Sequence, residues 1–87
     1  MEGGVVVGPT TEQITNYLSE TEKALFSFSL DPMAMRGRLP ALRGVIQLLE
    51  RTAYEAEDPE LQGRLSLLEI KARKCRDCIE RRLLINN

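Results

Sequence analysis

The 87-residue sequence contains no histidine and no tryptophan, and only 5% of its residues are aromatic. Without histidine, acid–base catalysis near neutral pH would depend on carboxylates. Several carboxylates lie four residues from a base, such as Glu55 from Arg51, Glu69 from Arg73 and Asp77 from Arg81, which is typical of the solvated faces of helices. We therefore predict that the protein is not an enzyme and has no catalytic residue, no cofactor and no small-molecule substrate.

Cysteine is almost as scarce, with Cys75 and Cys78 the two in the chain. A disulfide framework needs more cysteines, and a structural zinc site needs four ligands. A redox-active Cys-x-x-Cys pair normally begins a helix, whereas this pair lies well inside an expected one. We interpret both thiols as packing residues and predict no metal site, with a thiol or metal sensor through Cys75 and Cys78 as the second alternative.

Long apolar runs are also missing. The first nine residues, MEGGVVVGP, contain three consecutive apolar residues and no basic segment. This pattern predicts neither a signal peptide nor a membrane-spanning helix, and it favours a cytoplasmic protein without a membrane partner. The glycines of residues 1–8 predict a flexible tail, and residues 9–87 have the length of a single helical domain.

The formal charge is close to balance, at −1, but it is unevenly spread. Residues 1–31 carry five acids and one base, whereas residues 60–87 carry four acids and seven bases. We interpret this asymmetry first as attraction between segments that lie side by side in the fold. The basic C-terminal helix also keeps open an alternative function as a nucleic-acid-binding accessory protein, although its bases alternate with acids and no aromatic platform accompanies them.

The sequence does contain clear signals for the starts of helices. Thr10 can cap a helix, and Gln13 stands three residues later, so a capping box predicts a helix over about 11–29. The two Asp-Pro pairs at 31–32 and 58–59 each place a capping residue before a proline at the first helical position.

A second proline complicates the middle helix. Pro40 cannot donate to the carbonyl of Arg36, and Gly37 weakens the same turn. We therefore expect a kink or a break there, with a regular helix over about 40–57. The last helix is expected over about 59–84.

Apolar residues recur with a helical period in all three segments. The second and third segments follow a seven-residue repeat, and the very short turn between them predicts an antiparallel hairpin. The N-terminal helix is expected to cover the apolar flank of this hairpin. The predicted fold is all-α: an up-down-up three-helix bundle or a coiled-coil-like assembly. The expected core positions are Ile14, Tyr17, Leu18, Thr21, Ala24, Leu25 and Phe28, then Met35, Leu39, Leu42, Ile46, Leu49, Ala53 and Ala56, then Leu61, Leu65, Leu68, Ala72, Cys75 and Ile79.

Several apolar residues remain without a place in this core: Phe26, Leu30, Met33, Ile70 and Leu84. Together with the heptad helices, they favour a non-enzymatic protein–protein interaction module, such as an adaptor, an assembly subunit or a small chaperone, that binds the amphipathic helix of a partner. The partner would form a hetero-complex, or a homodimer through the helices. The predicted partner-binding residues are Val45, Leu48, Leu67, Ile70, Cys78, Leu84 and Ile85.

Overall fold

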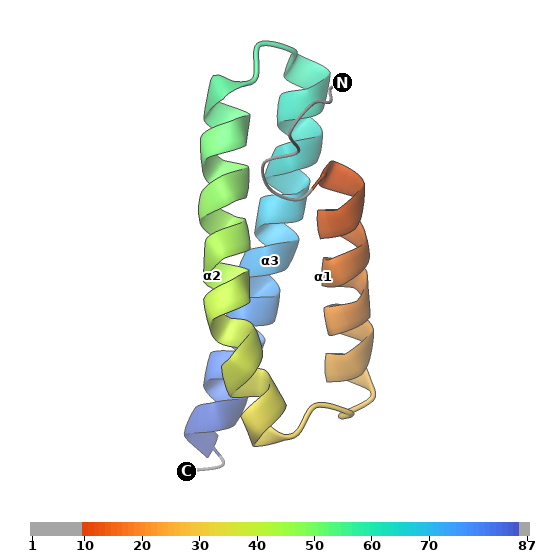
Figure 1. The fold of residues 1–87 in the computed structure, drawn as a ribbon, viewed down its shortest axis with the longest axis vertical. Coiled ribbons are helices and arrows are strands. Elements are labelled where there is room, and N and C mark those ends of the chain that lie inside the picture. Colours follow the sequence, from red (N-terminus) through yellow and green to blue (C-terminus); the bar gives the residue numbers. More distant parts are fainter. Residues whose placement is uncertain (1–9, 86–87) are drawn as a thin grey trace, which may run out of the picture.

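The protein folds as a bundle of three helices, as the sequence predicts (Figure 1). A computed structural model describes residues 10–85, so the tail predicted for residues 1–8 lies outside the described range. Helix α1 spans Thr11–Phe26, α2 spans Pro32–Glu55 and α3 spans Pro59–Ile85. Within residues 10–85 there is no β-strand.

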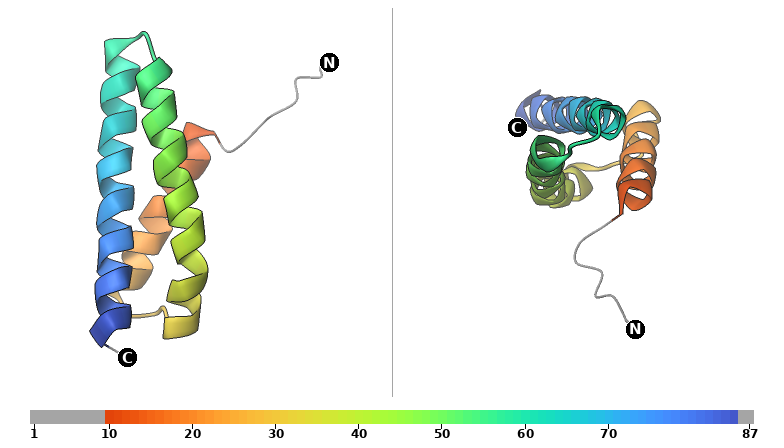
Figure 2. Two further views of the ribbon diagram at one scale, coloured as in Figure 1. Left: turned by 90° about the vertical axis from the view of Figure 1, so that its left-hand side faces the viewer. Right: turned by 90° about the horizontal axis from the view of Figure 1, so that it is seen from above.

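The helices alternate in direction, up-down-up, along the long axis of the molecule. Helices α2 and α3 form the long antiparallel hairpin, and α1 packs mainly on α3 (Figure 2). Helix α1 has 16 residues and α3 has 27, so α1 covers only part of the length of the hairpin. This topology brings the end of α1, the start of α2 and the end of α3 to one end of the bundle, which we name the α1–α2 loop end (Figure 1).

The predicted helix starts are confirmed. The backbone N–H of Gln13 donates to Thr10 Oγ1 at 3.1 Å, and the N–H of Thr10 donates to Gln13 Oε1 at 2.9 Å, which completes the capping box. The N–H of Ala34 donates to the Asp31 carboxylate at 2.7 Å. These bonds satisfy backbone donors that the first turn of a helix would otherwise leave unpaired.

Of the kink or break expected near Pro40, the break does not occur. Helix α2 is continuous from Pro32 through Pro40 to Glu55, and its first turns, drawn in yellow, lean toward α1 in Figure 1. The proline removes one backbone hydrogen bond, the one to the carbonyl of Arg36. Both Arg36 and Pro40 are exposed, so water can reach that carbonyl and the helix can continue.

Helix α1 ends at Phe26, earlier than the expected Ser29. The N–H of Ser29 donates to the carbonyl of Ala24 at 2.9 Å, and the N–H of Phe28 donates to that of Leu25 at 3.2 Å. This pair of bonds is a Schellman motif, in which the residue at the position of Phe28 adopts a left-handed conformation. Phe28 has a φ of 56°, a region that usually favours glycine.

The buried core follows the predicted stripes closely. The buried apolar residues are Ile14, Leu18, Leu25, Met35, Leu42, Ile46, Leu49, Ala53, Leu65, Ala72, Cys75 and Ile79, and Thr21 is buried with them. Phe28 and Leu61 do not belong to this core and are 76% and 38% exposed. Phe28 lies beyond the end of α1, and Leu61 lies in the first turn of α3, where α2 has already ended.

Ion pairs line the charged side of the hairpin. Arg43 on α2 pairs with Glu80 on α3 at 3.2 Å, and Arg73 on α3 pairs with Glu50 on α2 at 3.5 Å. Because these side chains are substantially exposed, each pair contributes at most about 1 kcal/mol. Their main effect is to favour the observed register of the two helices.

Candidate functional site

Large apolar side chains gather unburied at the α1–α2 loop end. A soluble protein exposes many single apolar residues, but a cluster at one place is more informative. The members of this cluster come from all three helices and the first connection, and each is at least three-quarters exposed: Phe26, Phe28, Met33, Leu84 and Ile85.

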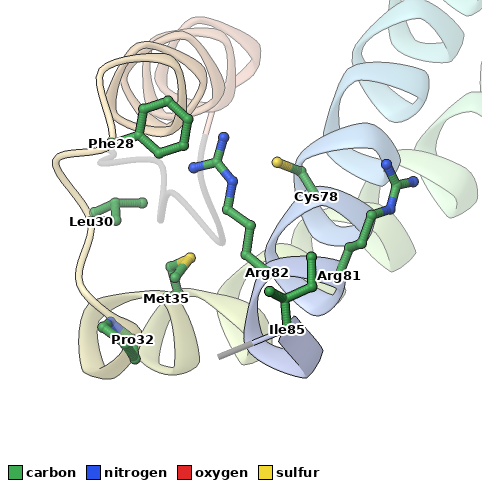
Figure 3. Close-up of a pocket in the computed structure, with 8 residues that line it drawn as sticks. All are labelled: Phe28, Leu30, Pro32, Met35, Cys78, Arg81, Arg82 and Ile85. Carbon is green, nitrogen blue, oxygen red and sulfur yellow. The ribbon is translucent and has the colours of Figure 1, made fainter. Parts of the chain in front are cut away.

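A cavity of about 570 Å³ opens within this cluster (Figure 3). The connection between α1 and α2 forms one wall and the last turns of α3 form the other. Among the described lining residues, two are arginines, none is acidic and most of the rest are apolar. They are Phe28, Leu30, Pro32, Met35, Cys78, Arg81, Arg82 and Ile85.

Arg82 connects the two walls of this cavity. Its Nη1 donates to the backbone carbonyl of Leu25 at 2.8 Å, and its guanidinium lies 4.3 Å from the centroid of the Phe28 ring. The carbonyl belongs to the last turn of α1, where the helix dipole favours a cation. In Figure 3 the Arg82 side chain extends from α3 across the cavity toward Phe28. Arg82 therefore holds the end of α1 and the Phe28 ring in place.

A second, smaller cavity of about 190 Å³ lies between α1 and α3. It shares Cys78 and Arg82 with the larger cavity. Its other lining residues are Glu22, Leu25, Phe26, Lys74 and Cys75. The two cavities therefore meet at the side chains of Cys78 and Arg82.

Both cysteines are free thiols, but their surroundings differ. Cys75 is buried in the core, and Cys78 is half-buried in the cavity wall. Burial raises the pKa of the Cys75 thiol, the nearby Glu22 and Cys78 add to the rise, and Lys71 opposes it. A raised pKa keeps Cys75 protonated at neutral pH, which makes it a poor nucleophile.

The seven predicted partner-binding residues do not form one surface. Cys78 and Ile85 line the large cavity. Val45 and Leu48 are half-buried against the core, and Val45 faces α1 in a separate hollow with Tyr17. Leu67 and Ile70 are exposed on α3 farther from the α1–α2 loop end, at 68% and 50%, whereas Leu84, at 76%, belongs to the exposed cluster but is not among the described residues that line the cavity.

The basic side chains of α3 form ion pairs with carboxylates at several different positions in the chain. Four of them pair with carboxylates within 4 Å: Arg64 with Glu60, Lys71 with Glu22, Arg73 with Glu50 and Glu69, and Arg76 with Asp77. These pairings interrupt any continuous row of bases along the helix. A phosphate backbone is best bound by such a row, so the arrangement offers little support for the nucleic-acid alternative.

Within residues 10–85, no group of three or more histidine, cysteine or acidic side chains is placed to hold a metal ion. None of the three helices has an apolar stretch long enough to cross a bilayer. In comparisons with protein-family models, with curated proteins and with solved structures, nothing matches this chain.

Most of the cavity could not be identified from the sequence. Cys78 and Ile85 were expected to bind a partner, but Arg81 and Arg82 carried no such signal. Phe28 was expected in the core because it continues the apolar stripe of α1. The charge of the last helix and the unplaced apolar residues at Phe26, Leu30 and Met33 were the signals that could have indicated this end of the bundle.

Proposed function

We propose that the protein is a non-enzymatic interaction module whose docking site is the large cavity at the α1–α2 loop end. The observation that carries the proposal is the cluster of exposed apolar side chains around this cavity, including Phe28 and Ile85 at 76% and 77% exposure. Apolar surface of this kind is stabilised when a partner covers it.

The occupant that fits is the apolar face of an amphipathic helix from another protein. Among the eight described lining residues, four are exposed, three are half-buried and one is buried, so a small molecule would keep much of its own surface in water, unlike a ligand in an enclosed pocket. The rim carries Arg81 and Arg82, and no described lining residue is acidic, so charge complementarity favours a helix that bears carboxylates beside its apolar face. Such a site would suit an adaptor, an assembly subunit or a small chaperone.

The proposal can be tested with a defined peptide and the whole chain. The probe is a synthetic amphipathic helix with leucines on one face and glutamates on its flanks, and a scrambled peptide of the same composition is the control. Two-dimensional NMR of the labelled protein should show shifts at Phe28, Met35 and Ile85 with the amphipathic peptide alone.

Two neighbouring substitutions sharpen this test. Ile85 lines the cavity, whereas Leu84, with nearly the same exposure, is not among the described lining residues. Ile85→Ser should weaken binding of the peptide about tenfold, because the buried area of one aliphatic side chain is lost. Leu84→Ser should leave the affinity nearly unchanged. Equal effects of the two substitutions, or peptide-induced shifts centred on Ile70, would contradict the proposed site.

A further inference from the structure

We infer that Arg82 is the residue of the docking site that recognises a carboxylate on the partner helix. This inference rests on the proposed function and specifies the chemistry of its partner. Arg82 is half-buried and lines both cavities. Within residues 10–85, no carboxylate lies within ion-pair distance of its guanidinium.

Among residues 10–85, one acceptor is hydrogen-bonded to the Arg82 guanidinium. A guanidinium has five N–H donors, and one of them, on Nη1, is occupied by the Leu25 carbonyl. The Phe28 ring lies against the guanidinium and offers only its π-electrons. A half-buried cation with free donors is stabilised most by a carboxylate, which accepts two parallel hydrogen bonds from the planar fork.

The same contacts prepare Arg82 for this role. The bond to α1 and the stacked ring hold the long side chain in one orientation, so less conformational entropy is lost when a ligand binds. Arg81, its neighbour, is exposed, and in Figure 3 its guanidinium points away from the Phe28 wall. Arg81 therefore contributes long-range attraction to an acidic partner, whereas Arg82 provides the specific contact.

The geometry also defines the partner segment. The carboxylate that reaches Arg82 must stand beside apolar side chains that cover Phe28 and Ile85, because these exposed residues line the same cavity. On a helix, this requires an acidic residue three or four positions from the inserted apolar residue. The inferred partner helix therefore carries a glutamate or aspartate at the edge of its apolar face.

The test compares the leucine–glutamate peptide with a twin in which every glutamate is glutamine. The wild-type chain should bind the glutamate peptide about tenfold more tightly than the twin, because a charge-assisted pair is replaced by a neutral one. Rising salt concentration should reduce this ratio. Arg82→Gln should bring the ratio close to one, and Arg82→Lys should leave it at an intermediate value, because the charge stays and the planar fork is lost. The matched control Arg81→Gln should keep most of the ratio.

The ratio is measured within each variant, so a loss of α1 packing in Arg82→Gln affects both peptides alike, and circular dichroism checks that the variant remains folded. Equal binding of the two peptides to the wild-type chain would overturn the carboxylate inference and leave the docking site intact. A ratio retained in Arg82→Gln but lost in Arg81→Gln would assign the contact to Arg81 instead. If neither peptide binds the wild-type chain, the proposed function itself fails, and the inference fails with it.

Discussion

Phe28 adopts a backbone conformation that bulky residues rarely adopt, and its ring still projects into solvent. Its φ of 56° costs about 1–2 kcal/mol relative to a right-handed conformation. The Schellman hydrogen bonds and the stacked Arg82 guanidinium offset part of this cost. Strained residues often lie at functional sites, and here the strain places an aromatic ring on the rim of the docking cavity.

Cys75 leads to a prediction about the pH dependence of stability. Burial raises the pKa of its thiol, so the folded chain retains this proton at pH values where the unfolded chain loses it. The contribution of the protonated Cys75 thiol to the free energy of unfolding is fully present below the ordinary thiol pKa of about 8.5. It is lost as the pH rises through the folded-state pKa. The free energy of unfolding should therefore fall above about pH 8.5, by at most about 1.4 kcal/mol per pH unit from this group.

Urea unfolding of the wild-type chain and of Cys75→Ala across this pH range measures the effect. The difference in stability between the two should shrink as the pH rises, because the wild-type chain loses the contribution of the Cys75 thiol and the variant has none to lose. Cys78→Ala is the matched control, since Cys78 is only half-buried. A difference between wild type and Cys75→Ala that stays constant with pH would show that Cys75 ionises freely in the folded protein.

At the scale of the helices, the sequence predicted their number, order and directions. It did not predict how the backbone continues at Pro40 or where α1 ends near Phe28. Capping residues such as Thr10 and Asp31 act through bonds to the first turn of their own helix, so their effect can be predicted from a short stretch of sequence. The outcome at Pro40 and Phe28 depends on more distant surroundings. Water reaches the unpaired carbonyl near Pro40, and Arg82, which lies far away in the sequence, contacts Phe28. The cavity combines such distant contacts, so its lining could not be predicted.

The exposed face of α2 allows a test of helix propensity. Gly44 lies inside α2, and a methyl group added at its Cα would meet no atom within 4 Å. Gly44→Ala should raise the free energy of unfolding by about 0.5–1 kcal/mol, because glycine loses more backbone entropy on folding. Thermal and urea unfolding would measure this gain.

Gly37→Ala is the matched comparison for Gly44→Ala. Its surroundings are equally open, but it lies in the turn that Pro40 disturbs. A similar gain at both positions is expected if the turn near Pro40 is fully helical, and a smaller gain at Gly37 would show a weakened helix there. A loss of stability from Gly44→Ala would contradict the open space around this residue and indicate that another surface packs on it.

At the scale of the whole molecule, the hairpin and α1 differ in how they are held. Helices α2 and α3 share a long buried seam, whereas α1 is short and packs mainly on α3. Polar contacts fix α1 at several points. Arg38 Nη1 donates to Thr21 Oγ1 at 2.7 Å, and Lys71 pairs with Glu22 at 3.8 Å. Such contacts contribute less than a long apolar seam, and salt weakens the exposed pair.

We therefore predict that α1 opens before the hairpin unfolds. In native-state hydrogen exchange, the amide of Leu18 should exchange through an opening free energy about 1–2 kcal/mol below that of Leu42 or Ile79. These three side chains are equally buried, each 0% exposed. A difference in their opening free energies would therefore report which helix opens first and not how deeply each residue is buried. Low concentrations of urea should promote the exchange of Leu18 less steeply than that of Leu42 or Ile79, because the opening of α1 exposes less surface than global unfolding does. Equal opening free energies would instead show a single cooperative unit, in which the docking cavity, formed in part by the end of α1, is as stable as the core of the bundle.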